Sequence, residues 1–229
     1  EQINGGPSST AENNGTAREN GRMGLVGRLK YDYKMRYIVE ANFRYDGSDK
    51  FPKGQRWGFF PSVSVGWNVD KEPFMQPLLN NNWFSALKFR FSWGKIGLDD
   101  VGNFKYLSVY NKGNDFYEGG KWNSTLREGD LVSQDLTWYS RNTINLAVDA
   151  EFFQQRLSAN FEYFYYRTTN YLANPKDAYT TPLGTAMPMV KTNSAHRRAG
   201  YELNLAWRDK IARDFKYNVG LNLSYYNEL

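Results

Sequence analysis

Strict two-residue alternation between Tyr37 and Val69 constrains the fold more than any other feature of this chain. One parity is polar or small, and the other carries, in order, Tyr37, Val39, Ala41, Phe43, Tyr45, Pro61, Val63, Val65, Trp67 and Val69. Successive side chains of a β-strand point to opposite faces, so the stretch predicts two two-faced strands joined by the turn-rich segment that begins at Asp46. The apolar face ends in Tyr and Trp at its margins, as is typical of a membrane-water interface.

The same alternation recurs in eight segments. They are approximately residues 23–33, 36–46, 59–69, 86–96, 141–152, 156–167, 199–208 and 214–226. Each is close to the ~9 to 11 residues that a tilted transmembrane strand requires. Three of the four odd-numbered connections are short and the even-numbered ones are long, which is the asymmetry of a barrel with periplasmic turns and extracellular loops. The exception contains Pro73 and Pro77, where we expect a short helical turn over residues 72–79.

Composition leaves a membrane barrel open and weakens other classes. Mean hydropathy is −0.70, but a barrel conceals its hydrophobicity in alternation, so this average does not exclude one. No run of apolar residues is long enough for a transmembrane helix. The net charge of +5 does not indicate nucleic-acid binding, because Lys and Arg are scattered among Asp and Glu without a basic stripe.

The sequence offers few residues that could form a catalytic or metal-binding site. His196 is the single histidine and there is no cysteine, so no His-based triad or zinc motif can be built, and we predict no enzyme activity, no metal and no cofactor. Aromatic residues in the expected loops are the better candidates for ligand contact: Trp57, Tyr106, Tyr110, Trp122, Tyr139 and Tyr179. The alternative is that these side chains pack their own loops or lie in an interfacial belt.

A family resemblance rests on the opening strands. Tyr45-Asp46-Gly47-Ser48 followed by Arg56-Trp57-Gly58-Phe59-Phe60-Pro61-Ser62-Val63-Ser64-Val65-Gly66-Trp67 resembles the strand-loop-strand signature of the SusC/RagA family of TonB-dependent outer-membrane transporters. The resemblance continues upstream in residues 27–33 and downstream in residues 87–94. It covers most of residues 22–226, more strongly in the first half.

The resemblance implies a fold, a location and partners. It implies a segment of an all-β, antiparallel, up-and-down transmembrane barrel of about 22 strands in the bacterial outer membrane. It also implies import of glycan oligomers or peptides captured with a SusD-like lipoprotein, powered by the TonB complex through a plug that is absent from this chain. Outer-membrane lipid would cover the apolar face; the residues expected to face it include Tyr37, Val39, Phe43, Val63, Val65, Phe89, Phe91, Leu146, Phe161, Leu203 and Leu221.

The arrangement of the eight strands has three possible forms. Residues 1–21 look like an interrupted loop and residues 22–226 like a barrel segment, which predicts an open curved sheet with two unpaired edges. A complete small eight-stranded barrel with a structural or adhesive role would instead require pairing between residues 25–33 and 215–225. A soluble carbohydrate-binding β-sandwich would require the apolar face to be buried against a second sheet.

Overall fold

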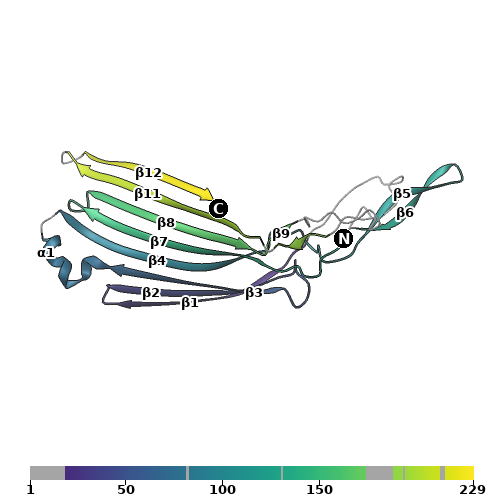
Figure 1. Cartoon of the computed structure of the whole chain (residues 1–229), viewed down its shortest axis with the longest axis horizontal. Helices are drawn as coiled ribbons and strands as arrows, with labels where there is room; N and C mark the ends of the chain where they lie inside the picture. The colour runs from purple at the N-terminus through teal and green to yellow at the C-terminus, as the bar shows by residue number, and fades with distance from the viewer. Residues whose placement is uncertain (1–18, 81–82, 130, 174–187, 193, 212–214) are drawn as a thin grey trace.

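The computed structural model describes residues 19–80, 83–129, 131–173, 188–192, 194–211 and 215–229. Its main feature is one eight-stranded sheet (Figure 1). The strands are β1 (Arg22–Tyr33), β2 (Tyr37–Ser48), β3 (Trp57–Asn68), β4 (Phe84–Leu98), β7 (Tyr139–Phe152), β8 (Leu157–Thr169), β11 (His196–Lys210) and β12 (Lys216–Glu228).

The sheet is an open, antiparallel meander. Its strand order, β1-β2-β3-β4-β7-β8-β11-β12, follows the chain, and each strand pairs with its sequence neighbours within the sheet. Within the described residues no ladder joins β1 to β12, and Figure 1 shows the two strands at opposite edges of the sheet. The predicted open eight-stranded sheet is therefore confirmed, and the closed small barrel is not what the chain forms.

The strand register gathers the alternating apolar residues on one side, which we call the apolar face. One transverse row on this face consists of Tyr31, Val39, Val65, Phe91, Leu146, Tyr163, Tyr201 and Tyr225. Leu146 is 50% exposed and Val65 is 40% exposed, so within the described residues this row is not covered by the second sheet that a sandwich would require. Aromatic pairs stack toward its two margins, with ring centroids 6.4 Å apart for Tyr37–Trp67 and 4.8 Å for Tyr45–Trp57.

Two of the short turns owe their shape to residues with positive φ. Lys34 and Met35 have φ of 54° and 56°, and the turn closes through a hydrogen bond from the Arg36 amide to the Tyr33 carbonyl. Successive left-handed residues give the primed turns whose twist matches that of the flanking strands. The Asp32 carboxylate accepts the Met35 amide at 2.8 Å, which supports this conformation without a glycine. Phe153 and Gln154 take the same sign of φ between β7 and β8.

The longer connection at this end folds into short helical turns, as expected. Two 3-10 turns, η2 (Val69–Lys71) and η3 (Pro73–Met75), lead into α1 (Gln76–Leu79), close to the ends of β2 and β3 (Figure 1). Val69 and Met75 are buried here. Glu72 is also buried and accepts a hydrogen bond from the Trp67 indole at 3.2 Å, with Arg36 at 3.6 Å. The Tyr37 hydroxyl, the Trp67 indole and the charge of Arg36 hold the pKa of Glu72 below its usual value.

The opposite end of the sheet carries the long connections, and these contain structure that alternation did not predict. The expected loop after Leu98 holds a hairpin, β5 (Tyr110–Glu118) and β6 (Lys121–Glu128), which projects beyond the end of the sheet in Figure 1. A second long loop holds the two-residue pair β9 (Leu172–Ala173) and β10 (Val190–Lys191). No helix in the described part of the chain is both long and apolar enough to cross a membrane.

Candidate functional site: the polar face of the sheet

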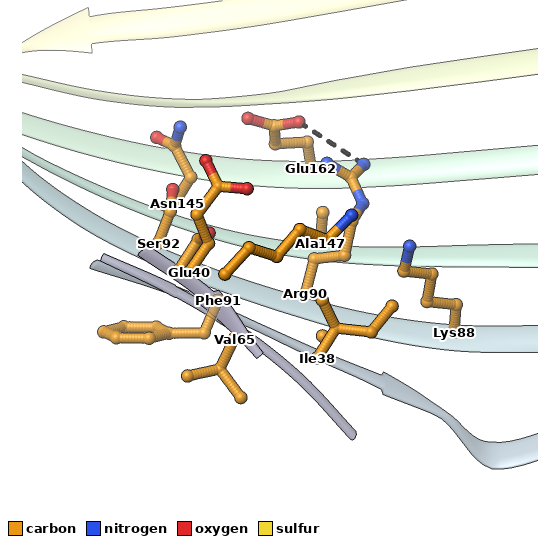
Figure 2. Close-up of a pocket in the computed structure, with 13 residues that line it drawn as sticks. Ile38, Glu40, Val65, Lys88, Arg90, Phe91, Ser92, Asn145, Ala147 and Glu162 are labelled. Carbon is orange, nitrogen blue, oxygen red and sulfur yellow. Dashed lines mark ion pairs between the residues drawn. The ribbon is translucent and has the colours of Figure 1, made fainter. Parts of the chain in front are cut away.

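The second side of the sheet, which we call the polar face, collects the charged and amide side chains. One transverse row on it consists of Lys30, Glu40, Ser64, Ser92 and Asn145. A second row, separated from the first by the row of Arg90 and Glu162, consists of Lys88, Asp149, Asn160, Asn204 and Asn222. Figure 2 shows Glu40, Lys88 and Arg90 on the polar side, while Phe91 and Val65 point away from them. The face is therefore a hydrophilic wall, built directly by the period-two pattern.

A hydrogen-bonded chain crosses four strands at the centre of this wall. The Arg90 guanidinium donates to both oxygens of Asp149, from Nε at 2.7 Å and from Nη2 at 3.1 Å. Asn160 donates to the same carboxylate, and Asn204 donates to Asn160 at 3.2 Å. Glu162 lies 3.9 Å from Arg90 Nη2, which is the ion pair drawn in Figure 2. Because Arg90 and Asp149 are each more than a third exposed, solvent screening limits the pair to about 1 kcal/mol or less.

Two hollows lie along the polar face. The first has a volume of about 300 Å³ and is lined mainly by polar-face residues such as Lys30, Glu40 and Arg90. The second, of about 640 Å³, is nearer the long connections and is lined by Arg44, Asp46 and Thr143 among others. Both fall near the size range of small-ligand sites. The first mixes charged and amide groups with Ile38, Val65 and Phe91, and the second combines such groups with the rings of Phe43, Phe60 and Trp93.

A cluster of guanidinium groups and tyrosines occupies the polar face near the long connections. Arg141 lies 4.5 Å from the Tyr166 ring centre, and Arg198 lies 4.4 Å from that of Tyr226. Arg198 is also paired with Glu228, and Arg141 donates to the Thr168 hydroxyl at 3.1 Å. Cation-π contacts and hydrogen bonds fix both guanidinium groups against the wall. Alternation alone did not single out this cluster, because its members come from four strands.

A compact aromatic knot closes the long-connection end of β3. Phe51 is fully buried, and Trp138 lies between it and Phe60, with ring centroids 5.3 Å and 5.2 Å away. The Trp138 indole donates to the Arg56 carbonyl at 2.7 Å. Phe60 fits on the polar face only because Gly97 has no side chain: a Cβ there would lie 1.9 Å from the Phe60 ring. Phe60 stands at a position where the alternation places polar residues, and this departure was the sequence signal that could have revealed the aromatic cluster.

Asp99, which directly follows β4, binds residues of the first two strands. Its buried carboxylate is paired with Arg22 and accepts the Ser48 hydroxyl at 3.0 Å. The ammonium of Lys50 donates to the Asp99 carbonyl at 3.0 Å. The long connection after β4 is therefore anchored to the connection between β2 and β3 by charge-assisted hydrogen bonds.

The predicted loop aromatics do not form one cluster. Trp57 lies on the apolar face, stacked on Tyr45, which is the interfacial alternative. Tyr110 and Trp122 lie on β5 and β6, with Trp122 against Tyr117 at 5.3 Å. Tyr106 contacts Phe104, and Tyr139 begins β7 at the polar parity. Tyr179 lies outside the described residues. A ligand role for these residues stays a prediction.

Comparison with known proteins assigns the architecture. Residues 2–228 match the family described as TonB dependent receptor-like, beta-barrel. The chain belongs to this family. It is 29% identical over 220 residues to TonB-dependent receptor SusC of Bacteroides thetaiotaomicron, and 28% identical over 202 residues to TonB-dependent receptor P39 of Formosa agariphila. These alignments cover 93% and 88% of the chain but 21% and 18% of the relatives, so the chain spans about a fifth of their length.

Solved structures agree on the fold. A structure of the RagAB peptide importer in its open-open state superposes with a TM-score of 0.78 at 20% sequence identity, covering 90% of this chain and 22% of the importer chain. The predicted resemblance to the SusC/RagA family and the outer-membrane location are therefore confirmed, and the family to which the chain belongs is one of transporters. As part of such a barrel, the sheet is expected to have lipid on its apolar face and the barrel interior on its polar face.

Proposed function

We propose that this chain forms a section of the wall of a SusC/RagA-like importer that takes up glycan oligomers or peptides. The observation that carries the proposal is the polar face, with its two hollows, in a sheet that matches both SusC and the RagAB peptide importer. The proposal includes capture of cargo with a SusD-like lipoprotein. It also includes coupling to TonB through a plug outside this chain.

The charge pattern of the wall supports passage rather than tight retention. Arg90 is neutralised by Asp149, and Arg28 by Glu40 at 2.6 Å, so neither pair presents a net charge that would hold an ionic cargo. Hydroxyl and amide groups of a glycan or a peptide can exchange hydrogen bonds with Ser64, Ser92 and Asn145 in turn. Transport requires binding that is weak and spread over several sites, which such a surface supplies.

In the proposed import, cargo would contact the loop aromatics before it reaches the polar face of the sheet. Tyr110 and Trp122 lie on the projecting β5–β6 hairpin, and both are more than 60% exposed, so their rings are available for stacking on sugar rings or apolar side chains. We assign cargo contact to these two residues together with Tyr106 and Tyr139. Trp57 serves as the comparison, because its ring stacks on Tyr45 at the apolar face.

Uptake by a deletion strain tests the proposal. The strain lacking the intact transporter is complemented with the wild type, with Tyr110→Ala/Trp122→Ala, or with Trp57→Phe, and is offered labelled glycan oligomers or peptides as separate substrates. We expect loss of uptake of one substrate class on deletion, reduced uptake in the double variant and normal uptake in Trp57→Phe. Unchanged uptake of every glycan and peptide in the deletion strain would contradict an import role for either class.

A further inference from the structure

Charged side chains are rare on the apolar face, and they are unevenly placed. In the eight described strands, the residues of apolar parity that carry charge are Lys95, Arg167, Arg197 and Asp209. Asp209 is at the short-turn end, 3.5 Å from Arg156. The three cations are all at the end that carries the long connections, which is the extracellular end of the barrel.

Arg167 and Arg197 form a directly opposed cross-strand pair. Arg197 of β11 is the register partner of Arg167 of β8, and both side chains are exposed. Directly opposed residues have Cβ atoms about 4.5 to 5.5 Å apart, and like charges in such positions repel. No ion pair or hydrogen bond joins either guanidinium to a carboxylate within the part of the chain that the structure describes. Arg198, one residue away on the polar face, shows the contrast, because it is paired with Glu228.

The position of the pair along the strands matches the headgroup layer of the membrane. Toward the centre of the sheet, Tyr165 lies two residues from Arg167 on β8, and Tyr201 lies four residues from Arg197 on β11. Tyr201 stacks on Phe161 and makes a tilted ring contact with Tyr225, which marks an interfacial aromatic band. Two residues of strand span about 6.6 Å, so the guanidinium groups lie just beyond this band. A cation there meets the polar headgroups of the outer leaflet rather than hydrocarbon.

We propose that Arg167 and Arg197 together bind a phosphate group of a lipopolysaccharide headgroup in the outer leaflet. A guanidinium fork matches phosphate oxygens in two parallel hydrogen bonds, and two adjacent forks can hold one phosphate from both sides. The bound anion removes the repulsion between the two arginines. Lys95 has the same register position two strands away, separated from Arg167 by Asn142, so it adds positive charge without belonging to the pair.

Lipid binding by the intact transporter tests this site without reference to cargo. The detergent-purified protein is titrated with diphosphorylated lipid A and, separately, with lipid A from which the phosphates have been removed, and the bound lipid is counted by native mass spectrometry. The variants are Arg167→Gln/Arg197→Gln and the charge-retaining Arg167→Lys/Arg197→Lys. The matched control is Arg208→Gln/Lys216→Gln, which removes two positive charges from the polar parity of β11 and β12 at the other end of the sheet.

We expect lipid A binding to depend on the positive charge of the pair, on its position on the apolar face and on the phosphate groups of the lipid. The glutamine pair should weaken lipid A binding about tenfold or more, the lysine pair should retain an intermediate affinity, and the control should bind like the wild type. Binding by the wild type should weaken as salt is raised. Equal binding of dephosphorylated lipid A, or undiminished binding by the glutamine pair, would overturn the proposal.

Discussion

An arginine placed at Val63 should be among the most destabilising single changes on the apolar face, because Val63 lies at the midplane of the lipid-facing band. Phe59 and Trp67, at the two aromatic margins of β3, are each four residues away. Four residues span about 13 Å of strand. With a strand tilt of about 40°, this becomes about 10 Å of depth on each side, close to half of the ~25 Å apolar band.

The magnitude follows from that depth. A Val63→Arg substitution should lower the free energy of unfolding by roughly 2 to 4 kcal/mol, the range for a cation at the midplane of a membrane barrel. Ser64→Arg is the matched control, since it puts the same side chain one residue away on the polar face, opposite Glu40. Trp67→Arg provides the depth control. Placing the charge at this position near the interface should itself cost about 0 to 1 kcal/mol.

Denaturant unfolding of the intact protein in lipid vesicles measures the three variants. The shift in midpoint, multiplied by the slope of the transition, gives each difference in the free energy of unfolding. If lipid covers the apolar face, Val63→Arg should have the lowest free energy of unfolding of the three variants, and Ser64→Arg should remain close to the wild type. Equal destabilisation by Val63→Arg and Ser64→Arg would refute the assignment of lipid to the apolar face.

Three further predictions concern the short-turn end, the aromatic knot and the polar wall. The pKa of Glu72 is lowered in the folded state. The stability that ionised Glu72 contributes should therefore be complete above its ordinary pKa and should be lost as pH falls through the folded pKa. Glu72→Gln should accordingly flatten the acid side of a plot of melting temperature against pH. Gly97→Ala should destabilise by about 1 to 3 kcal/mol in denaturant unfolding by displacing Phe60, whereas Gly66→Ala, whose Cβ would meet only the Lys88 side chain and Ile38 at 3.4 Å or more, should be nearly neutral. Purified protein should not hydrolyse glycans or peptides, and turnover that disappears in Glu162→Gln would refute this.

The family and the general fold could be predicted from local sequence pattern, but the candidate site could be predicted only in outline. Alternation marks Glu40, Arg90 and Glu162 as members of one polar face, since each lies between apolar neighbours in its own strand. It cannot show that Arg90 meets Asp149, because these residues are 59 positions apart and their contact depends on the register of β4 against β7. The loop aromatics were chosen by residue type, and the structure places them in separate contacts.

Which strands exist, and which side of each is apolar, was determined by the sequence itself, because the two-residue period is a local property of every extended segment. The tertiary structure alone decided that, within the described residues, β1 and β12 do not pair with each other, that a hairpin forms between Tyr110 and Glu128, and that Phe60 is buried at a polar parity. It also decided that Arg167 lies opposite Arg197. The physical reason is that register and edge pairing are set by hydrogen bonds between distant segments, and a shift of one residue in any ladder would move a whole strand's side chains to the other face.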